Sequence, residues 1–154
     1  MNKTLLTGLI FLLLNAAVKA QPEPVEFTYL TNCTLKNEVK LGGGINCFVV
    51  NNLPQFNKTF VAPKTVGGAA AGPNFGSQRV IAAAMAPTIR DTKLIIQKVE
   101  MAGNTLNVHC VVQYGNNLTY KMKPLQVVSV QRASFIKRIA FYRDGRMIKL
   151  FAVR

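Results

Sequence analysis

The sequence predicts a mainly β protein: an antiparallel immunoglobulin-like sandwich, or a partly open barrel, with one short helix. Alternating apolar and polar runs recur through the second half of the chain. Two pairs of these runs meet at the turn-forming dipeptides Gly103-Asn104 and Asp144-Gly145. No alternation of strands with helices is present, which disfavours a parallel sheet. Seven or eight short strands joined by tight turns are typical of sandwiches and barrels.

Residues 1–20 have the features of an export signal. Lys3 precedes an apolar stretch that ends at residue 14, and the segment closes on the small residue Ala20. The apolar stretch is shorter than the roughly 20 residues that a membrane-spanning helix needs. We therefore expect cleavage after Ala20, a periplasmic or extracellular location, no membrane span, and a single β-rich domain over residues 21–154.

Residues 25–50 predict two extended runs, with a turn at the glycines of positions 42–44. Cys33 lies in the first run and Cys47 in the second. Export permits disulfides, and the turn could bring the two runs together. The sequence leaves two alternatives open, a Cys33–Cys47 bridge or unpaired buried thiols. Cys110 is expected to be free and buried in either case.

One helix is predicted, over residues 53–60. Asn52 is a suitable N-cap residue, and Pro54 fits the first turn of a helix. The following stretch, 61–74, has neither periodicity nor bulky side chains and predicts a loop. The apolar residues expected on one face of the helix are Leu53, Phe56 and Phe60.

The second half of the chain predicts strands in series. The first is an apolar run without alternation, as in a buried strand. The next two alternate on either side of Gly103-Asn104 and predict a hairpin. Pro124 then separates two further strands. In sequence order, the expected strands are 78–86, the two halves of 93–115, 118–123 and 125–132.

The last hairpin turns at Asp144-Gly145, and alternation around this turn gives each strand two different faces. We expect one face to be apolar and buried and the other to be basic and exposed. The exposed face would include Arg138 and Lys149. The apolar face would comprise Ile139, Phe141, Ile148 and Leu150.

The charge of the chain is strongly positive, at +13 overall. Without Lys3 and Lys19, 17 Lys and Arg stand against 6 Asp and Glu, which still gives +11. Such a surface attracts anionic partners, or it is simply well solvated. Nucleic acid is disfavoured because aromatic residues at the spacing of nucleic-acid-binding modules are missing. The candidate basic patch comprises Arg138, Arg143, Arg146 and Lys149.

The supply of reactive side chains argues against an enzyme. No motif places two of the six carboxylates as an acid and base pair, and no serine has the context of a nucleophile elbow. The one histidine, His109, adjoins Cys110 on a predicted strand, where neighbouring side chains point to opposite faces. We expect no catalytic activity, no cofactor and no metal site.

The stretch MAPTIRDTKLII, residues 85–96, poses the main functional question. Small apolar residues end at Pro87, and polar groups precede the next alternating run. This pattern predicts a loop, which is either an ordinary solvated turn or a tip that contacts a partner. The candidate contacts are Thr88, Ile89, Arg90 and Asp91.

A series of short motifs around this stretch resembles a known family. In order along the chain they are Asn74-Phe75-Gly76, the strand RVIAAAM, Pro87-Thr88, the hairpin LIIQKVE and TLNVHCVV, and Pro124 with LQVVSV. They resemble the C-terminal domain of the protease-complex subunit PrcB, found in exported bacterial proteins. The resemblance covers about residues 56–142. It implies a sandwich fold and a partner that is another exported or envelope protein, such as a protease.

One departure from that family falls in the candidate loop. The family has glycine-glycine-tyrosine after Pro-Thr, in a loop similar to one that chagasin-like inhibitors insert into a protease cleft. This chain has Ile89-Arg90-Asp91 there, and it lacks the glycines that adopt positive φ without cost. The resemblance therefore implies the fold more firmly than inhibition. The leading hypothesis is an exported, non-catalytic binding protein; the alternative is a basic envelope-surface protein that binds polyanions through the C-terminal hairpin.

Overall fold

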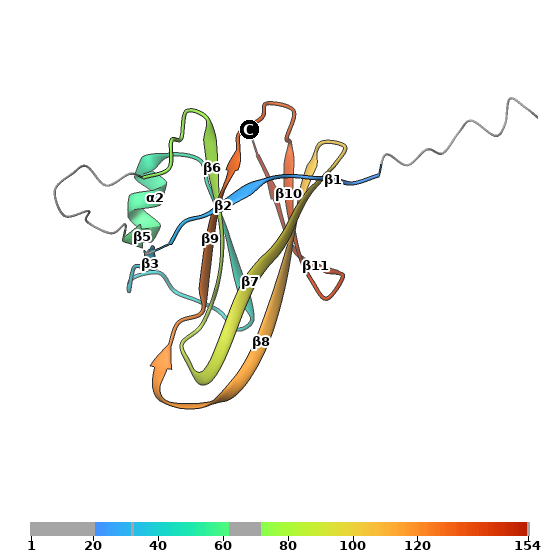
Figure 1. The fold of residues 1–154 in the computed structure, drawn as a ribbon. Coiled ribbons are helices and arrows are strands. Elements are labelled where there is room, and N and C mark those ends of the chain that lie inside the picture. Colours follow the sequence, from blue (N-terminus) through green and yellow to red (C-terminus); the bar gives the residue numbers. More distant parts are fainter. Residues whose placement is uncertain (1–20, 32, 62–71, 154) are drawn as a thin grey trace, which may run out of the picture.

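A computed structural model of the protein describes residues 21–31, 33–61 and 72–153. Two β-sheets pack face to face, and a small third layer covers one of them (Figure 1). The prediction of a mainly β sandwich with one helix is confirmed. The predicted export signal, residues 1–20, and the part of the predicted loop from 62 to 71 lie outside the described residues.

The first sheet has five strands in the order β1-β7-β8-β10-β11. Its neighbours are antiparallel except for β8 and β10, which run parallel. This parallel pair departs from the prediction of an antiparallel sandwich. It arises because the chain crosses from the second sheet, which contains β9, back to the first sheet before β10 begins. The strands are β1 (Glu23–Pro24), β7 (Thr88–Ala102), β8 (Thr105–Met122), β10 (Arg138–Arg143) and β11 (Arg146–Ala152).

The second sheet has four antiparallel strands in the order β2-β9-β6-β4. The helix α2 and a two-stranded pair, β3 and β5, form the third layer on its outer face. The sheet strands are β2 (Phe27–Tyr29), β4 (Ile45–Val50), β6 (Gln78–Met85) and β9 (Leu125–Gln131). The third layer comprises β3 (Thr34–Leu35), α2 (Leu53–Thr59) and β5 (Phe60–Val61).

Two hydrophobic cores lie on either side of β6. Ile81 and Ala83 face the inner core between the sheets, whereas Val80 and Ala82 face the outer core under α2. Residues 79–84 are consequently all buried. Burial on both faces explains why this strand has an apolar run without alternation.

The helix begins at its predicted cap. Asn52 Oδ1 accepts a hydrogen bond from Gln55 N (2.9 Å), and Asn51 N donates to Gln55 Oε1 (3.0 Å). Phe56 and the residue after the helix, Phe60, are each 1% exposed, with ring centroids 5.3 Å apart. Leu53 is 51% exposed, so its predicted place on the buried face is wrong. It occupies the first position of a helix of seven residues, before the turn that contacts the sheet.

The predicted hairpin turn at Gly103-Asn104 is confirmed, but its second strand is longer than predicted. β8 continues through Gly115 to Met122, whereas the sequence predicted a break there and a separate strand over 118–123. A Cβ on Gly115 would lie 2.9 Å from Asp91 Oδ2. Glycine is present at this position because β7 approaches closely, rather than because the chain turns.

The final hairpin turns at Asp144-Gly145 as predicted, with positive φ at both residues (50° and 75°). The predicted faces of β11 are wrong. A β-bulge between Phe141 and Tyr142 shifts the register, so Phe141 pairs with Lys149 instead of Ile148. A shift of one residue exchanges the two faces of a strand. Phe151 therefore packs on Phe141 (5.8 Å between centroids), whereas Leu150 is 47% exposed.

The predicted pair of extended runs over 25–50 is divided among several sheets. β2 pairs with β9, β3 with β5, and β4 with β6. The glycines at 42–44 form a bend in which Gly42 N donates to Asn46 Oδ1 (2.9 Å) and Asn46 Nδ2 donates to the carbonyl of Gly42 (3.1 Å). This bend does not join paired strands. Pairing with distant strands has replaced the local pairing that the sequence suggested.

Candidate binding surface on the arm

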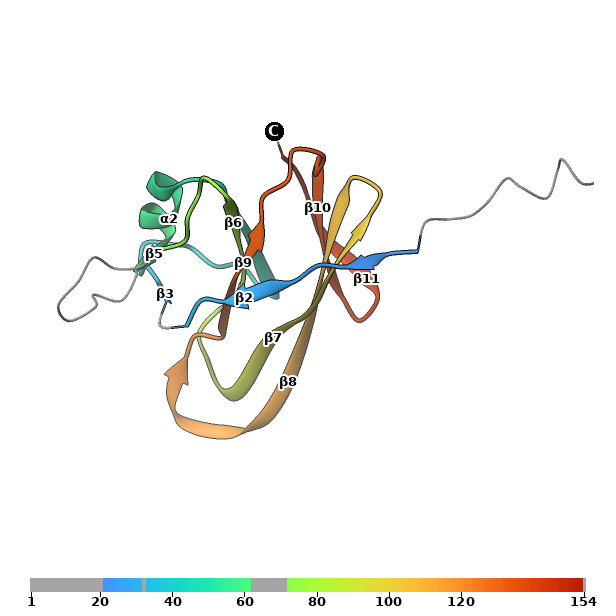
Figure 2. The same cartoon turned by 45° about the horizontal axis from the view of Figure 1, so that its top comes forward.

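The β7–β8 hairpin extends beyond the rest of its sheet. β1 pairs with β7 only at Glu100 and Met101, and β10 pairs with β8 only as far as Cys110. Within the described residues, the remaining part is a two-stranded ribbon, residues 88–95 and 111–122, which we call the arm. It curves away at the lower end of the molecule, where β8 bends back toward β9 (Figure 1, Figure 2).

The candidate contacts from Thr88 to Asp91 lie in this arm rather than in a loop. Thr88 pairs with Met122 and Arg90 with Asn117, with register shifts on both sides of Arg90. The loop prediction was wrong because β8 continues far enough to give these residues a strand partner. The four residues lie at the start of β7, and Figure 1 shows this end of the strand at the lower end of the molecule.

Arg90 is held in a fixed position by its neighbours. Its guanidinium carbon lies 4.8 Å from the ring centroid of Tyr114, and its Nε donates a hydrogen bond to the carbonyl of Gly115 (3.0 Å). Its backbone is fixed as well, because the N–H donates to Thr88 Oγ1 (3.1 Å) and the carbonyl accepts from Thr92 Oγ1 (2.9 Å). An arginine ordered in this way loses little conformational entropy when it contacts a partner.

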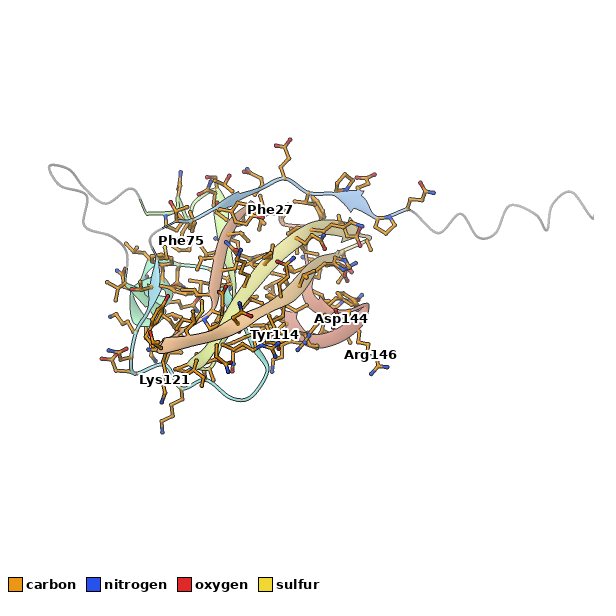
Figure 3. The ribbon with its side chains drawn as sticks, turned by 60° about the horizontal axis from the view of Figure 1, so that its bottom comes forward. Phe27, Phe75, Tyr114, Lys121, Asp144 and Arg146 are labelled. Carbon is orange, nitrogen blue, oxygen red and sulfur yellow. The ribbon has the colours of Figure 1, made fainter. Side chains whose placement is uncertain are left out.

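Three large apolar or aromatic side chains are exposed on the arm. Ile89 is 51%, Tyr114 47% and Tyr120 63% exposed. Figure 3 shows Tyr114 on the surface of the arm, with Lys121 near its end. Sequence reasoning missed both tyrosines because β8 was expected to break at Gly115. The available signal was their position on either side of the polar stretch 115–119.

The four residues of the predicted basic patch do not share one face. Arg143 and Arg146 pair across the last turn, where Arg143 Nε also donates to Asp144 Oδ2 (3.2 Å); Figure 3 shows Asp144 and Arg146 together there. Arg138 lies at the other end of β10 and donates to Asn104 Oδ1 (3.2 Å). Because of the bulge, Lys149 pairs with Phe141; its side chain is exposed, with Nζ 5.7 Å from the ring centroid of Phe151. Of the four predicted residues, Arg138 is therefore separated from the other three, which lie toward the last turn.

A polar cluster on the open face of the five-stranded sheet surrounds Glu100. Its carboxylate pairs with Lys98 and accepts a hydrogen bond from His109 Nε2 (2.8 Å). The hydrogen bond from Lys98 lowers the pKa of Glu100, His109 adds to this effect, and burial opposes it. His109 in turn stacks on Tyr142 (5.2 Å between centroids). These contacts satisfy one another and give the cluster a structural role.

Of the two alternatives left open for Cys33 and Cys47, the structure has the unpaired thiols, and all three cysteines are free. Cys33 packs against the outer core and Cys47 against the inner core, so the four-stranded sheet separates them. Cys110 is buried in the inner core, as predicted. Burial raises the pKa of Cys47 to about 12, with a further increase from Cys110 and a small opposing effect of Lys149. Burial also raises the pKa of Cys110 to about 11.

Three further findings concern metal binding, membrane spans and known proteins. Among residues 21–31, 33–61 and 72–153, no group of three or more His, Cys, Asp and Glu side chains is arranged to hold a metal ion. No helix in this part of the chain is long and apolar enough to cross a membrane. Comparisons with protein-family models, curated proteins and solved structures found no match to this sequence.

Proposed function

We propose that this is a non-catalytic binding protein that contacts a protein partner through the arm. The observation that carries the proposal is that three large side chains of one ribbon are exposed, Ile89, Tyr114 and Tyr120, and that Arg90 is fixed over the ring of Tyr114. Tyrosine and arginine are enriched among the residues that dominate binding energy at protein interfaces. Exposed apolar groups that are rimmed by polar residues mark interaction sites.

The backbone of the arm supports the same proposal. In the described residues, no other strand pairs with either outer edge of the ribbon over 88–95 and 111–122. Open strand edges bind extended segments of partners through main-chain hydrogen bonds. Residues 88–91 are part of a twisted ribbon, so a partner would meet a surface rather than a narrow inserted loop. The resemblance noted in the sequence suggests an exported or envelope protein, such as a protease, as this partner.

The alternative function, polyanion binding through the C-terminal hairpin, has less support. It was motivated by four basic residues along one edge. Arg138, at the far end of β10, is separated from Arg143, Arg146 and Lys149, and this shortens the row of charge that an extended polyanion would contact.

The test of the arm compares two triple variants in a pull-down from the envelope fraction of the source organism. The arm variant carries Ile89→Ser, Tyr114→Ser and Tyr120→Ser. The control variant removes three similarly exposed apolar side chains elsewhere, with Leu53→Ser, Phe135→Ser and Leu150→Ser. We expect at least about tenfold lower partner recovery with the arm variant, equivalent to about 1.4 kcal/mol, and unchanged recovery with the control. Equal recovery with both variants would contradict the arm assignment, and the absence of any reproducible partner would contradict the binding class.

A further inference from the structure

A pocket of about 770 Å³ lies between the third layer and the link from β8 to β9. One wall is formed by β3 and the turn after it, and the other by residues 121–125. Figure 3 shows Lys121 where the end of β8 approaches β3. The volume is within the range of small-molecule sites, which is about 300–1,000 Å³.

The pocket carries an excess of positive charge. Lys36, Lys121 and Lys123 line it, against the single carboxylate of Glu38. Lys123 Nζ donates to Asn37 Oδ1 (2.9 Å), a neutral acceptor that orders the ammonium group without neutralising it. The ion pairs of the described residues involve none of these three lysines. An anionic group in the pocket would therefore gain charge-assisted hydrogen bonds from unpaired ammonium groups.

The rest of the lining is aliphatic. Leu35, Leu41 and Leu125 contribute side chains from three different segments, and Ala84 of β6 lies between the two walls. The described lining includes no aromatic residue. The stacking surfaces that recognise nucleobases and sugar rings are therefore missing, whereas an alkyl chain would bury apolar area against these residues.

We propose that this pocket binds a small aliphatic amphiphile with an anionic headgroup, a carboxylate or a phosphate. The lysines hold the headgroup at the mouth, and the leucines contact the chain. The site shares Lys121 with the arm, but it uses none of the side chains to which the partner-binding role is assigned, Ile89, Arg90, Tyr114 and Tyr120.

The test measures binding of dodecanoate and dodecyl phosphate to the purified protein by calorimetry, below their micelle concentrations. Dodecyltrimethylammonium, which has the same chain and opposite charge, and inorganic phosphate, which has no chain, are the comparison probes. The pocket variant is Lys121→Gln with Lys123→Gln, and the control is Lys58→Gln with Lys137→Gln, which removes the same charge from exposed positions outside the lining. A second variant, Thr34→Trp, fills the pocket from the exposed strand β3.

We expect at least one of the anionic amphiphiles to bind and to shift amide resonances of residues 34–38, 121–123 and 125. The pocket variant should weaken this binding about tenfold, as expected for two exposed charges, and Thr34→Trp should abolish it, while the control changes it less than about twofold. Phosphate alone should bind far more weakly. The proposal is overturned if neither anionic amphiphile binds, if the cationic amphiphile binds equally well, or if the control variant weakens binding as much as the pocket variant.

Discussion

The two sheets of this sandwich differ in how many of their faces are covered. The four-stranded sheet is buried on both sides, by the other sheet and by α2 with β3 and β5. The five-stranded sheet is covered on one side only, and its long hairpin continues beyond its neighbours as the arm. We propose that this difference separates two roles within the molecule. The covered sheet stabilises the fold, and the open sheet presents the side chains that can contact a partner.

The largest effect is expected in the outer core. Phe56→Ala removes a ring from a side chain that is 1% exposed. The centroid of this ring lies 5.3 Å from that of Phe60 and 5.9 Å from that of Phe75. We expect this substitution to lower the free energy of unfolding by about 3–5 kcal/mol. Leu53→Ala, on the same helix but 51% exposed, should cost less than about 1 kcal/mol. Urea unfolding measures both; equal costs would show that the third layer is not a true core.

The next effect tests which side of β11 faces inward. Phe151→Ala removes a half-buried ring packed on Phe141 and should cost about 2–3 kcal/mol. Leu150→Ala, at the neighbouring exposed position, should cost less than about 1 kcal/mol. If the strand lacked the bulge, Leu150 would face the core, and Leu150→Ala would then cost more stability than Phe151→Ala. The same unfolding experiment therefore decides the register.

A smaller, pH-dependent effect is expected on the open face. The lowered pKa of Glu100 means that the folded state favours the ionised carboxylate, so its stabilisation is present at neutral pH and is lost as pH falls through the folded pKa. Glu100→Gln should cost about 1 kcal/mol at pH 7. The difference in the free energy of unfolding between this variant and the wild-type protein should become smaller below about pH 4, near the ordinary pKa of glutamate. Glu26→Gln, at an exposed position, is the control; a constant difference between pH 7 and pH 3 would argue against the ionised cluster.

The last prediction concerns the reactivity of the three cysteines rather than the stability of the fold. Because they are free and lie on both sides of the covered sheet, alkylation under denaturing, non-reducing conditions should modify three thiols. In the native protein at pH 8, Cys47 and Cys110 should react slowly, since their raised pKa values leave little thiolate. Intact mass spectrometry counts the modifications. A count of one would indicate a disulfide.

Local signals predicted the parts of the fold that depend on local chemistry. Asn52 caps α2, and Gly103 and Gly145 provide the positive φ of their turns, because a few neighbouring residues decide these features. The bulge in β11 could not be predicted in this way. The sequence predicted where β11 lies but not its pairing register with β10. That register is coupled to the packing of Phe151 against Phe141.

The candidate site was predicted only in part for a similar reason. The polar stretch from Thr88 to Asp91 suggested a loop, and the glycine at 115 suggested a strand end. Asp91 and Gly115 are 24 residues apart in the sequence, yet they lie side by side in one ribbon, where the missing side chain of Gly115 leaves room for that of Asp91. Pairing over this distance leaves no local sign, so Tyr114 and Tyr120 were not recognised as part of the same surface.

Native-state hydrogen exchange, measured amide by amide, tests the contrast between the two sheets most directly. Amides of β6 are expected to exchange only through global unfolding, since this strand is paired on both sides and buried on both faces. The outward amides of the arm over 111–122 should exchange at least about a hundredfold faster. Protection of the arm equal to that of β6 in the free protein would contradict the proposal that the arm is an open surface.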